Sequence, residues 1–160
     1  MEDIWNITAL VVSVLSVLLS LYALRQATTK NTSDMYLFFI SQYAKEDMKL
    51  ALRKLKDIKR GVYRLEQWES DMKNNLPKAF EYDEARRLVK YFYDTLAYMK
   101  LEKLIEARFV RLICLKKGAW LYLDTVEAME KFFDSGYDKK PYAVIWDVCE
   151  NLRKEGCCPP

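Results

Sequence analysis

The sequence IWNITALVVSVLSVLLSLYAL, residues 4 to 24, decides the architecture that we expect. These 21 residues contain no charged side chain, and their polar members are Asn6, Thr8, Tyr22 and three serines. As a helix that rises about 1.5 Å per residue, the run is about 30 Å long, which is the thickness of the hydrocarbon core of a bilayer. The run therefore predicts a single transmembrane helix, with Trp5 and Tyr22 at the two headgroup levels.

A cleaved signal peptide is the alternative interpretation of this run. Such peptides begin with Lys or Arg, have an apolar core of about 7 to 15 residues and end at a small-x-small cleavage site. The run here follows Glu2 and Asp3 and is longer, so a retained anchor is favoured. Arg25 and Lys30 follow it and no Lys or Arg precedes it. By the positive-inside rule, we expect a protein of the plasma (inner) membrane with its N-terminus outside and residues 25 to 160 in the cytoplasm.

Small residues recur along one face of the predicted membrane helix. Their spacing of three or four positions places them on one side: Ala9, Ser13, Ser16, Ser20 and Ala23. Such a face lets two helices approach closely, and serine hydroxyls can then bond across the contact. It predicts a homo-oligomer or packing against another membrane protein. The alternative is that the hydroxyls bond carbonyl groups of their own helix.

The composition excludes several classes of active site. The chain has 160 residues, with 26 Lys and Arg against 23 Asp and Glu, and it contains no His. Without His, Ser-His-Asp and Cys-His catalytic systems and His-containing zinc sites are excluded. The four glycines lie too far apart to form a phosphate loop. We expect no enzyme activity, no cofactor and no metal. A net charge of +5 beyond residue 24 is also too mild for a dedicated nucleic-acid binder.

Residues 28 to 65 are expected to form one long amphipathic helix with a basic edge. Apolar side chains recur every three or four positions between residues 37 and 62. Beside them runs a line of five cations with similar spacing: Lys45, Lys49, Arg53, Lys56 and Arg60. An anionic surface such as the inner leaflet would relieve their mutual repulsion. In a straight helix Lys45 would stand about 30 Å from the interface, so lipid contact needs a bend near residues 28 to 33. The alternative is a solvated face that covers a bundle core.

The rest of the chain predicts a compact helical bundle. Residues 66 to 80 contain Asn and Pro and are expected to form a loop. Residues 81 to 156 show several apolar helical faces and no alternation typical of strands, and residues 157 to 160 are a tail. Gly118, after two lysines, indicates a helix C-terminus, and Pro141 indicates the first turn of the last helix, which Gly156 closes. The expected fold is all-α, with a transmembrane anchor in residues 1 to 27 and a cytoplasmic bundle of about five helices.

The four cysteines do not point to a chemical site. Cys114 and Cys149 fall on apolar helical faces and are expected in the core, where a free thiol packs as a small apolar group. Cys157 and Cys158 lie near the end of the sequence, and their role stays open.

Three segments carry a resemblance to a known family. They are EARRLVKYFYDTLAYMK at residues 84 to 100, LIEARFVRLI at residues 104 to 113 and LDTVEAMEKFF at residues 123 to 133. In this order they resemble an uncharacterised bacterial family with one N-terminal transmembrane helix and a small helical cytoplasmic domain. The resemblance brings no catalytic residues. Arg86 and Arg87 match its paired arginines and are expected to pair with Glu127 or Glu130, with an anionic ligand as the alternative.

Two functional hypotheses follow from the sequence. The leading one is a non-enzymatic, single-pass membrane-anchored interaction or scaffold protein, which self-associates or serves as an accessory subunit of a membrane complex. The alternative is a membrane-tethered binder of anionic lipid or nucleic acid, which would use the five cations of residues 45 to 60.

Overall fold

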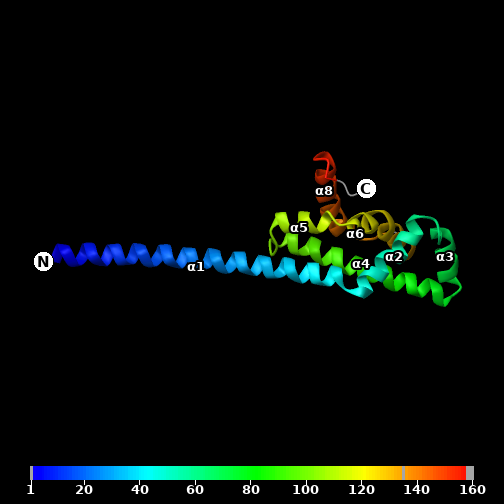
Figure 1. Cartoon of the computed structure of the whole chain (residues 1–160), viewed down its shortest axis with the longest axis horizontal. Coiled ribbons are helices and arrows are strands. Elements are labelled where there is room, and N and C mark those ends of the chain that lie inside the picture. The colour runs from blue at the N-terminus through cyan, green and yellow to red at the C-terminus, as the bar shows by residue number, and fades with distance from the viewer. Residues whose placement is uncertain (1, 135, 158–160) are drawn as a thin grey trace. The chain divides into compact units, whose positions relative to one another are not determined.

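We describe the protein from a computed structural model. The description covers the backbone of residues 2 to 134 and 136 to 157, and their side chains except at residues 2 to 14, 24, 25, 27 to 29, 31 and 32. This part of the chain is all-α, with eight α-helices and one short π-helix and no strand (Figure 1). The elements are α1 (Glu2–Ala44), α2 (Glu46–Lys59), α3 (Leu65–Lys73), α4 (Pro77–Leu101), α5 (Ala107–Cys114), α6 (Lys117–Leu121), η1 (Tyr122–Val126), α7 (Glu127–Phe133) and α8 (Lys140–Lys154).

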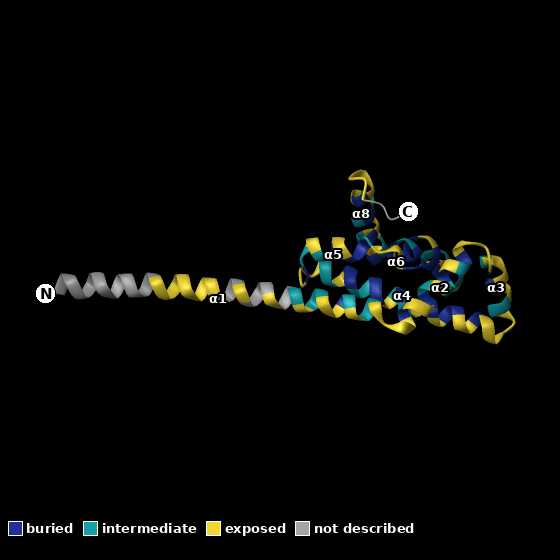
Figure 2. Cartoon of the chain, in the orientation of Figure 1, coloured by how far each residue is buried: buried dark blue, intermediate teal, exposed yellow. Residues whose placement is uncertain are grey.

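The chain divides into two units, Met1–Met35 and Tyr36–Pro160. The first is helical, and its residues 15 to 23 are exposed (Figure 2). Within the described residues, we find no helix that is both long enough and apolar enough to cross a bilayer. Residues 4 to 14 of the predicted membrane helix lie outside those whose side chains are described. The second unit contains the hydrophobic core.

The long helix expected over residues 28 to 65 is in fact two helices and a turn. Helix α1 ends at Ala44, and Lys45 has an extended backbone with φ −61° and ψ 149°, so a new helix begins after it. The acidic side chains of Glu46 and Asp47 favour a helix N-terminus at this point, because they complement the positive end of its dipole. Helix α2 ends before Gly61, whose φ of 73° lets the chain turn.

The loop expected over residues 66 to 80 contains a helix, α3, and the first turn of α4. The reason lies in tertiary packing, because Trp68 of α3 is fully buried and its Nε1 donates a hydrogen bond of 3.2 Å to the carbonyl of Ala79. The ring of Trp68 also packs edge-on against Phe132, with 5.3 Å between centroids. Only residues 74 to 76 separate α3 from α4, which starts at Pro77.

Helix α4 contributes the largest share of the buried core residues among the helices described, and α2, α3, α5, α8 and η1 pack against it (Figure 2). Its buried face includes Val89, Phe92, Tyr93 and Leu96. Phe92 meets Phe39 from the end of α1, with 5.4 Å between ring centroids. This arrangement joins residues 36 to 44 to the second unit. The cysteines behave as expected, since Cys114 and Cys149 are fully buried.

The bundle has more and shorter helices than the five expected. Gly118 does not end a helix but lies inside α6, and α6, η1 and α7 follow one another without a break. The expectations for the last helix are confirmed: Pro141 lies in the first turn of α8, and Gly156 follows its end with φ 73°.

Candidate anion-binding groove

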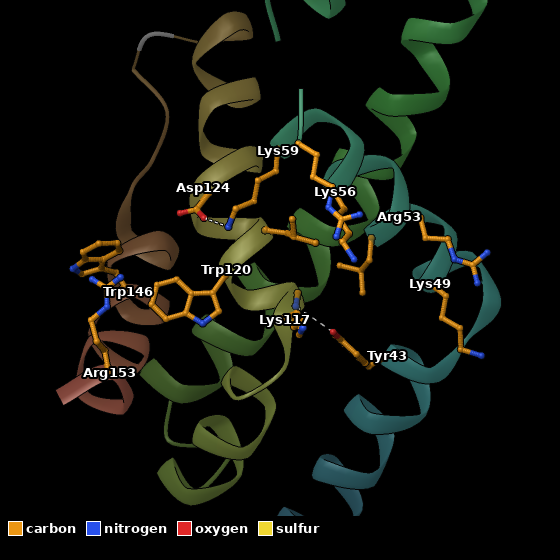
Figure 3. Close-up of a pocket in the computed structure, with 14 residues that line it drawn as sticks. Tyr43, Lys49, Arg53, Lys56, Lys59, Lys117, Trp120, Asp124, Trp146 and Arg153 are labelled. Atoms are coloured by element: carbon orange, nitrogen blue, oxygen red, sulfur yellow. Dashed lines mark hydrogen bonds and ion pairs between the residues drawn. The ribbon is translucent and has the colours of Figure 1, made fainter. Parts of the chain in front are cut away.

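A groove of about 880 Å³ lies between α2, the α6–η1 segment and α8 (Figure 3). Seven of the 14 residues that line it are cations, and Asp124 is the one carboxylate among them. The cations are Lys49, Arg53, Lys56, Lys59, Arg60, Lys117 and Arg153. The lining is therefore strongly positive.

Four of the five cations predicted as a line lie along this groove: Lys49, Arg53, Lys56 and Arg60. Lys45 is outside it, at the start of α2. Residues 28 to 33, where contact with the inner leaflet would need a bend, are helical within α1. Four of the predicted cations thus form one wall of a groove.

The periodicity of α2 explains why its cations share a wall. Met48, Ala51, Leu55 and Ile58 recur every three or four residues and are buried against the rest of the bundle. The cations occupy the neighbouring face of the same helix. Lys54 lies outside the groove, and its Nζ is 3.0 Å from Glu81 Oε2.

Part of the positive charge in the groove is compensated by carboxylates. Lys59 Nζ is 2.5 Å from Asp124 Oδ2, and Lys49 Nζ is 3.3 Å from Glu46 Oε2. Arg153 is 3.7 Å from Glu150. Exposed pairs of this kind contribute little to stability, so they do not hold these side chains rigidly.

The remaining four cations of the groove have no ion-pair partner among the described residues. They are Arg53, Lys56, Arg60 and Lys117. Cations gathered on the walls of a cavity raise the local concentration of anions. The groove is therefore built to attract negative charge.

Two tryptophans form a second kind of surface in the groove. In Figure 3, Trp120 and Trp146 lie on the side away from Lys49 and Arg53 of α2. The guanidinium carbon of Arg153 is 5.3 Å from the ring centroid of Trp120, which is a cation–π distance. Trp146 is 39% exposed and stacks on Tyr142, with 6.2 Å between centroids and 18° between planes.

Gly118 lies in the lining of the groove, in close contact with side chains of α1 and α4. Its N–H donates a hydrogen bond of 3.2 Å to the hydroxyl of Tyr43. A Cβ at this position would be 2.7 Å from Tyr93 Oη and 3.0 Å from the Tyr43 ring, so only glycine fits without movement. Burial raises the pKa of Tyr43, although its bond with Gly118 lowers it in part.

The π-helix η1 places Asp124 in the groove. Short π-helical segments often occur at functional sites, because the extra residue per turn re-aims the side chains. Sequence reasoning did not identify Lys117, Trp120, Trp146 or Arg153 as groove residues. The lysines before Gly118 were a signal, but they were assigned to a helix C-terminus.

Only part of the small-residue face predicted to pack membrane helices lies within the described side chains. Ala9 and Ser13 lie outside those whose side chains are described, whereas Ser16, Ser20 and Ala23 are exposed on α1. The Ser20 hydroxyl donates a hydrogen bond of 2.8 Å to the carbonyl of Ser16 in the same helix. This is the local alternative to bonding between helices.

The paired arginines form ion pairs within the bundle rather than lining the groove. Arg86 is buried, contacts Glu130 and has its Nε 2.8 Å from Asp83 Oδ1. Arg87 is 2.6 Å from the other oxygen of Asp83. The expected pairing with Glu127 or Glu130 is confirmed for Arg86, through Glu130, whereas Arg87 pairs with Asp83 of its own helix. Glu127 instead contacts two lysines, Lys131 at 3.0 Å and Lys139 at 3.7 Å.

Comparisons with known proteins add no assignment: no family model, no curated protein and no solved structure matches the chain. The family resemblance of the three segments therefore stays a prediction.

Proposed function

We propose that this protein is a membrane-anchored binding protein whose groove holds an anionic ligand. The observation that carries the proposal is the convergence of cations without ion-pair partners, from α2 and α6, on one cavity. Its volume of about 880 Å³ falls within the range of small-molecule sites. A non-enzymatic role is favoured, because the lining combines cations, tryptophans and aliphatic side chains with one carboxylate that Lys59 already neutralises.

The anchor is the second part of the proposal. The uncharged run of residues 4 to 24 has the length of a bilayer core. Its described portion carries Leu15, Val17, Leu18, Leu19, Leu21 and Tyr22, all more than half exposed. So much exposed apolar surface on one helix is stable in lipid and costly in water. Arg25 and Lys30 favour a cytoplasmic position for the groove.

Protease protection tests the anchor and its orientation. In sealed inner-membrane vesicles with the cytoplasmic face outward, added protease should degrade residues 36 to 160, and the intact protein should resist extraction by alkaline carbonate. Release by carbonate would contradict the anchor. Protection of the whole chain in these vesicles would contradict the orientation.

Calorimetric titration tests the groove. The full-length protein in mild detergent is titrated with inorganic tripolyphosphate, and we expect binding that weakens as salt is added, because salt screens exposed charges. Replacing two groove cations, Arg53→Gln with Lys56→Gln, should reduce the affinity at least tenfold.

The matched control removes the same charge outside the groove, with Lys45→Gln and Lys154→Gln. Both residues are exposed. The control should lower the affinity much less than the groove variant does, because neither side chain lines the groove. Equal losses in the two double variants would show that the groove is not the site.

Self-association through α1 is a second candidate function, in which the protein is a scaffold or accessory subunit. The observation that favours it is that Ser16, Ser20 and Ala23 lie exposed along the predicted anchor. Ser16→Leu with Ser20→Leu should shift the detergent-solubilised protein from oligomer to monomer, because large side chains keep helix backbones apart. The control is Val17→Leu with Leu21→Ile. An unchanged oligomer in the serine variant would remove this candidate.

A further inference from the structure

The groove has two chemically different sides, and together they restrict the class of ligand. Figure 3 shows Lys49, Arg53 and Lys56 along α2, and Trp120 and Trp146 across from them. A ligand that contacts both sides must carry negative charge at one end and a flat apolar group at the other. A simple inorganic anion would use only the first side.

The cationic side suits a group with several negative charges close together. Arg53 and Lys56 lie on successive turns of α2, and Arg60 follows directly after its end. None of the three has an ion-pair partner among the described residues. Lys117 adds a fourth such cation from α6. The planar guanidinium of arginine matches two phosphate oxygens at once, and lysine provides a point charge. Linked phosphates meet these requirements better than a single carboxylate.

The tryptophan side suits a planar ring. Trp146 is 39% exposed, so part of its indole surface is open to a ligand. Every nucleobase has a flat face that stacks on aromatic side chains. The stacking of Trp146 on Tyr142 fixes the indole plane, which reduces the entropy lost when a ligand ring stacks on it.

The lining favours a nucleotide over an anionic lipid. Acyl chains need a continuous apolar channel, but Leu52 and Leu121 are the only aliphatic side chains that line the groove. A cavity of about 880 Å³ is of the size that holds a small ligand.

We propose that the ligand of this groove is a nucleoside polyphosphate, with its base stacked on the tryptophan side and its phosphates bound by Arg53, Lys56 and Lys117. This inference rests on the function proposed above and deepens it. The phosphates supply most of the affinity, and the base supplies the preference over other polyanions.

Titration calorimetry of the full-length protein in detergent, without magnesium, tests the inference. The probes are ATP, GTP, CTP and UTP, with tripolyphosphate as the matched anion that has no base. At least one nucleotide should bind tenfold or more tightly than tripolyphosphate. Trp146→Leu should reduce this advantage to about twofold or less and leave the tripolyphosphate affinity unchanged, because it removes only the stacking surface.

The variant Trp146→Phe is the matched control for the ring. It should retain most of the preference for the nucleotide, because phenylalanine preserves an aromatic face at the same place. The preference in the unmodified protein is decisive even if the leucine variant folds poorly.

The outcomes separate this inference from the function that it rests on. If tripolyphosphate binds as tightly as all four nucleotides, the nucleotide assignment is wrong and the anion-binding groove stands. If none of the five probes binds, the proposed function itself fails. If a short single-stranded oligonucleotide binds far more tightly than any mononucleotide, the groove serves a nucleic acid and the mononucleotide assignment is overturned.

Discussion

Arg86 is the residue on which the buried charges of the bundle depend. It is 7% exposed and lies between Asp83 and Glu130, which are 1% and 8% exposed. Two carboxylates taken out of water are stable there because the guanidinium compensates them. The guanidinium carbon of Arg86 also lies 4.7 Å from the centroid of the Phe133 ring, and this cation–π contact helps to hold the side chain in place.

We predict that Arg86→Met lowers the free energy of unfolding by about 3–5 kcal/mol, because it leaves buried carboxylates without their main partner. Urea unfolding of the full chain in detergent, followed by circular dichroism, measures this loss. The control is Arg87→Met, whose side chain is 69% exposed. It should cost less than about 1 kcal/mol. Similar losses for the two variants would contradict the assigned role of Arg86.

The lowered pKa of Glu127 predicts that the stability of the fold depends on pH. Burial raises its pKa, but the hydrogen bonds from Lys131 and Tyr142 outweigh it, so the net pKa is lowered from the usual 4.5. Because the folded pKa lies below the unfolded one, this carboxylate stabilises the fold above about pH 4.5. The contribution is lost as the pH falls through the folded pKa.

We therefore expect Glu127→Gln to flatten the acid limb of the stability curve below pH 4.5. The measurement is the urea midpoint of both proteins from pH 7 to pH 3, with Glu84→Gln, at an exposed position, as a reference for surface carboxylates. An acid limb as steep as that of the unmodified protein would show that Glu127 is not the responsible group.

At the scale of elements, α6 can approach α1 and α4 closely because Gly118 has no side chain. Gly118 has a negative φ, so its conformation does not require glycine, and the requirement is one of space. A methyl group there would meet the hydroxyl of Tyr93, which is fully buried and has no hydrogen-bond partner among the described residues. The position of the groove wall therefore depends on close packing.

We predict that Gly118→Ala lowers the free energy of unfolding by about 1–3 kcal/mol, because an overpacked core must shift. Tyr93→Phe removes the nearest atom and an unpartnered buried hydroxyl, so it should be close to neutral by itself. In the double variant, part of the loss should be recovered. Thermal unfolding of the four proteins checks this, and strictly additive effects would contradict the contact.

Helix boundaries show which elements were predictable. Pro141 and Gly156 mark α8 through local backbone chemistry, because proline has a fixed φ and glycine tolerates a positive φ. The break at Lys45 was missed, because the apolar period continues across it. Helix α3 was missed because Trp68 packs against Phe132, which is far away in the sequence, and bonds to Ala79 of the next helix.

At the scale of the whole molecule, the core belongs to Tyr36–Pro160. Its first buried residue is Phe39, near the end of α1. Before it, Tyr36 packs against this core, and it is the first of the described residues to do so. The two parts of α1 thus have separate roles, the first as the proposed anchor and the last turns as part of the bundle.

We predict that residues 36 to 160, expressed alone, unfold cooperatively and within a few degrees of the full chain. Residues 45 to 160 should be less stable by about 3–5 kcal/mol or fail to fold, because Phe39 and its contact with Phe92 are lost. Circular dichroism melts of both proteins are the measurement. A cooperative transition of residues 45 to 160 at the same temperature would contradict this division.

Sequence periodicity was sufficient for the all-α class, for the buried cysteines and for the shared face of Lys49, Arg53, Lys56 and Arg60. The physical reason is that a helix places residues three and four positions apart on one side, whatever surrounds it. The opposite wall of the groove could not be found in this way. Lys117, Trp120 and Trp146 come from α6 and α8, and periodicity specifies the faces of each helix but not which faces meet. Which faces meet depends on long-range packing around α4. This packing brings α6 and α8 to the cations of α2, so that residues of all three helices line one groove.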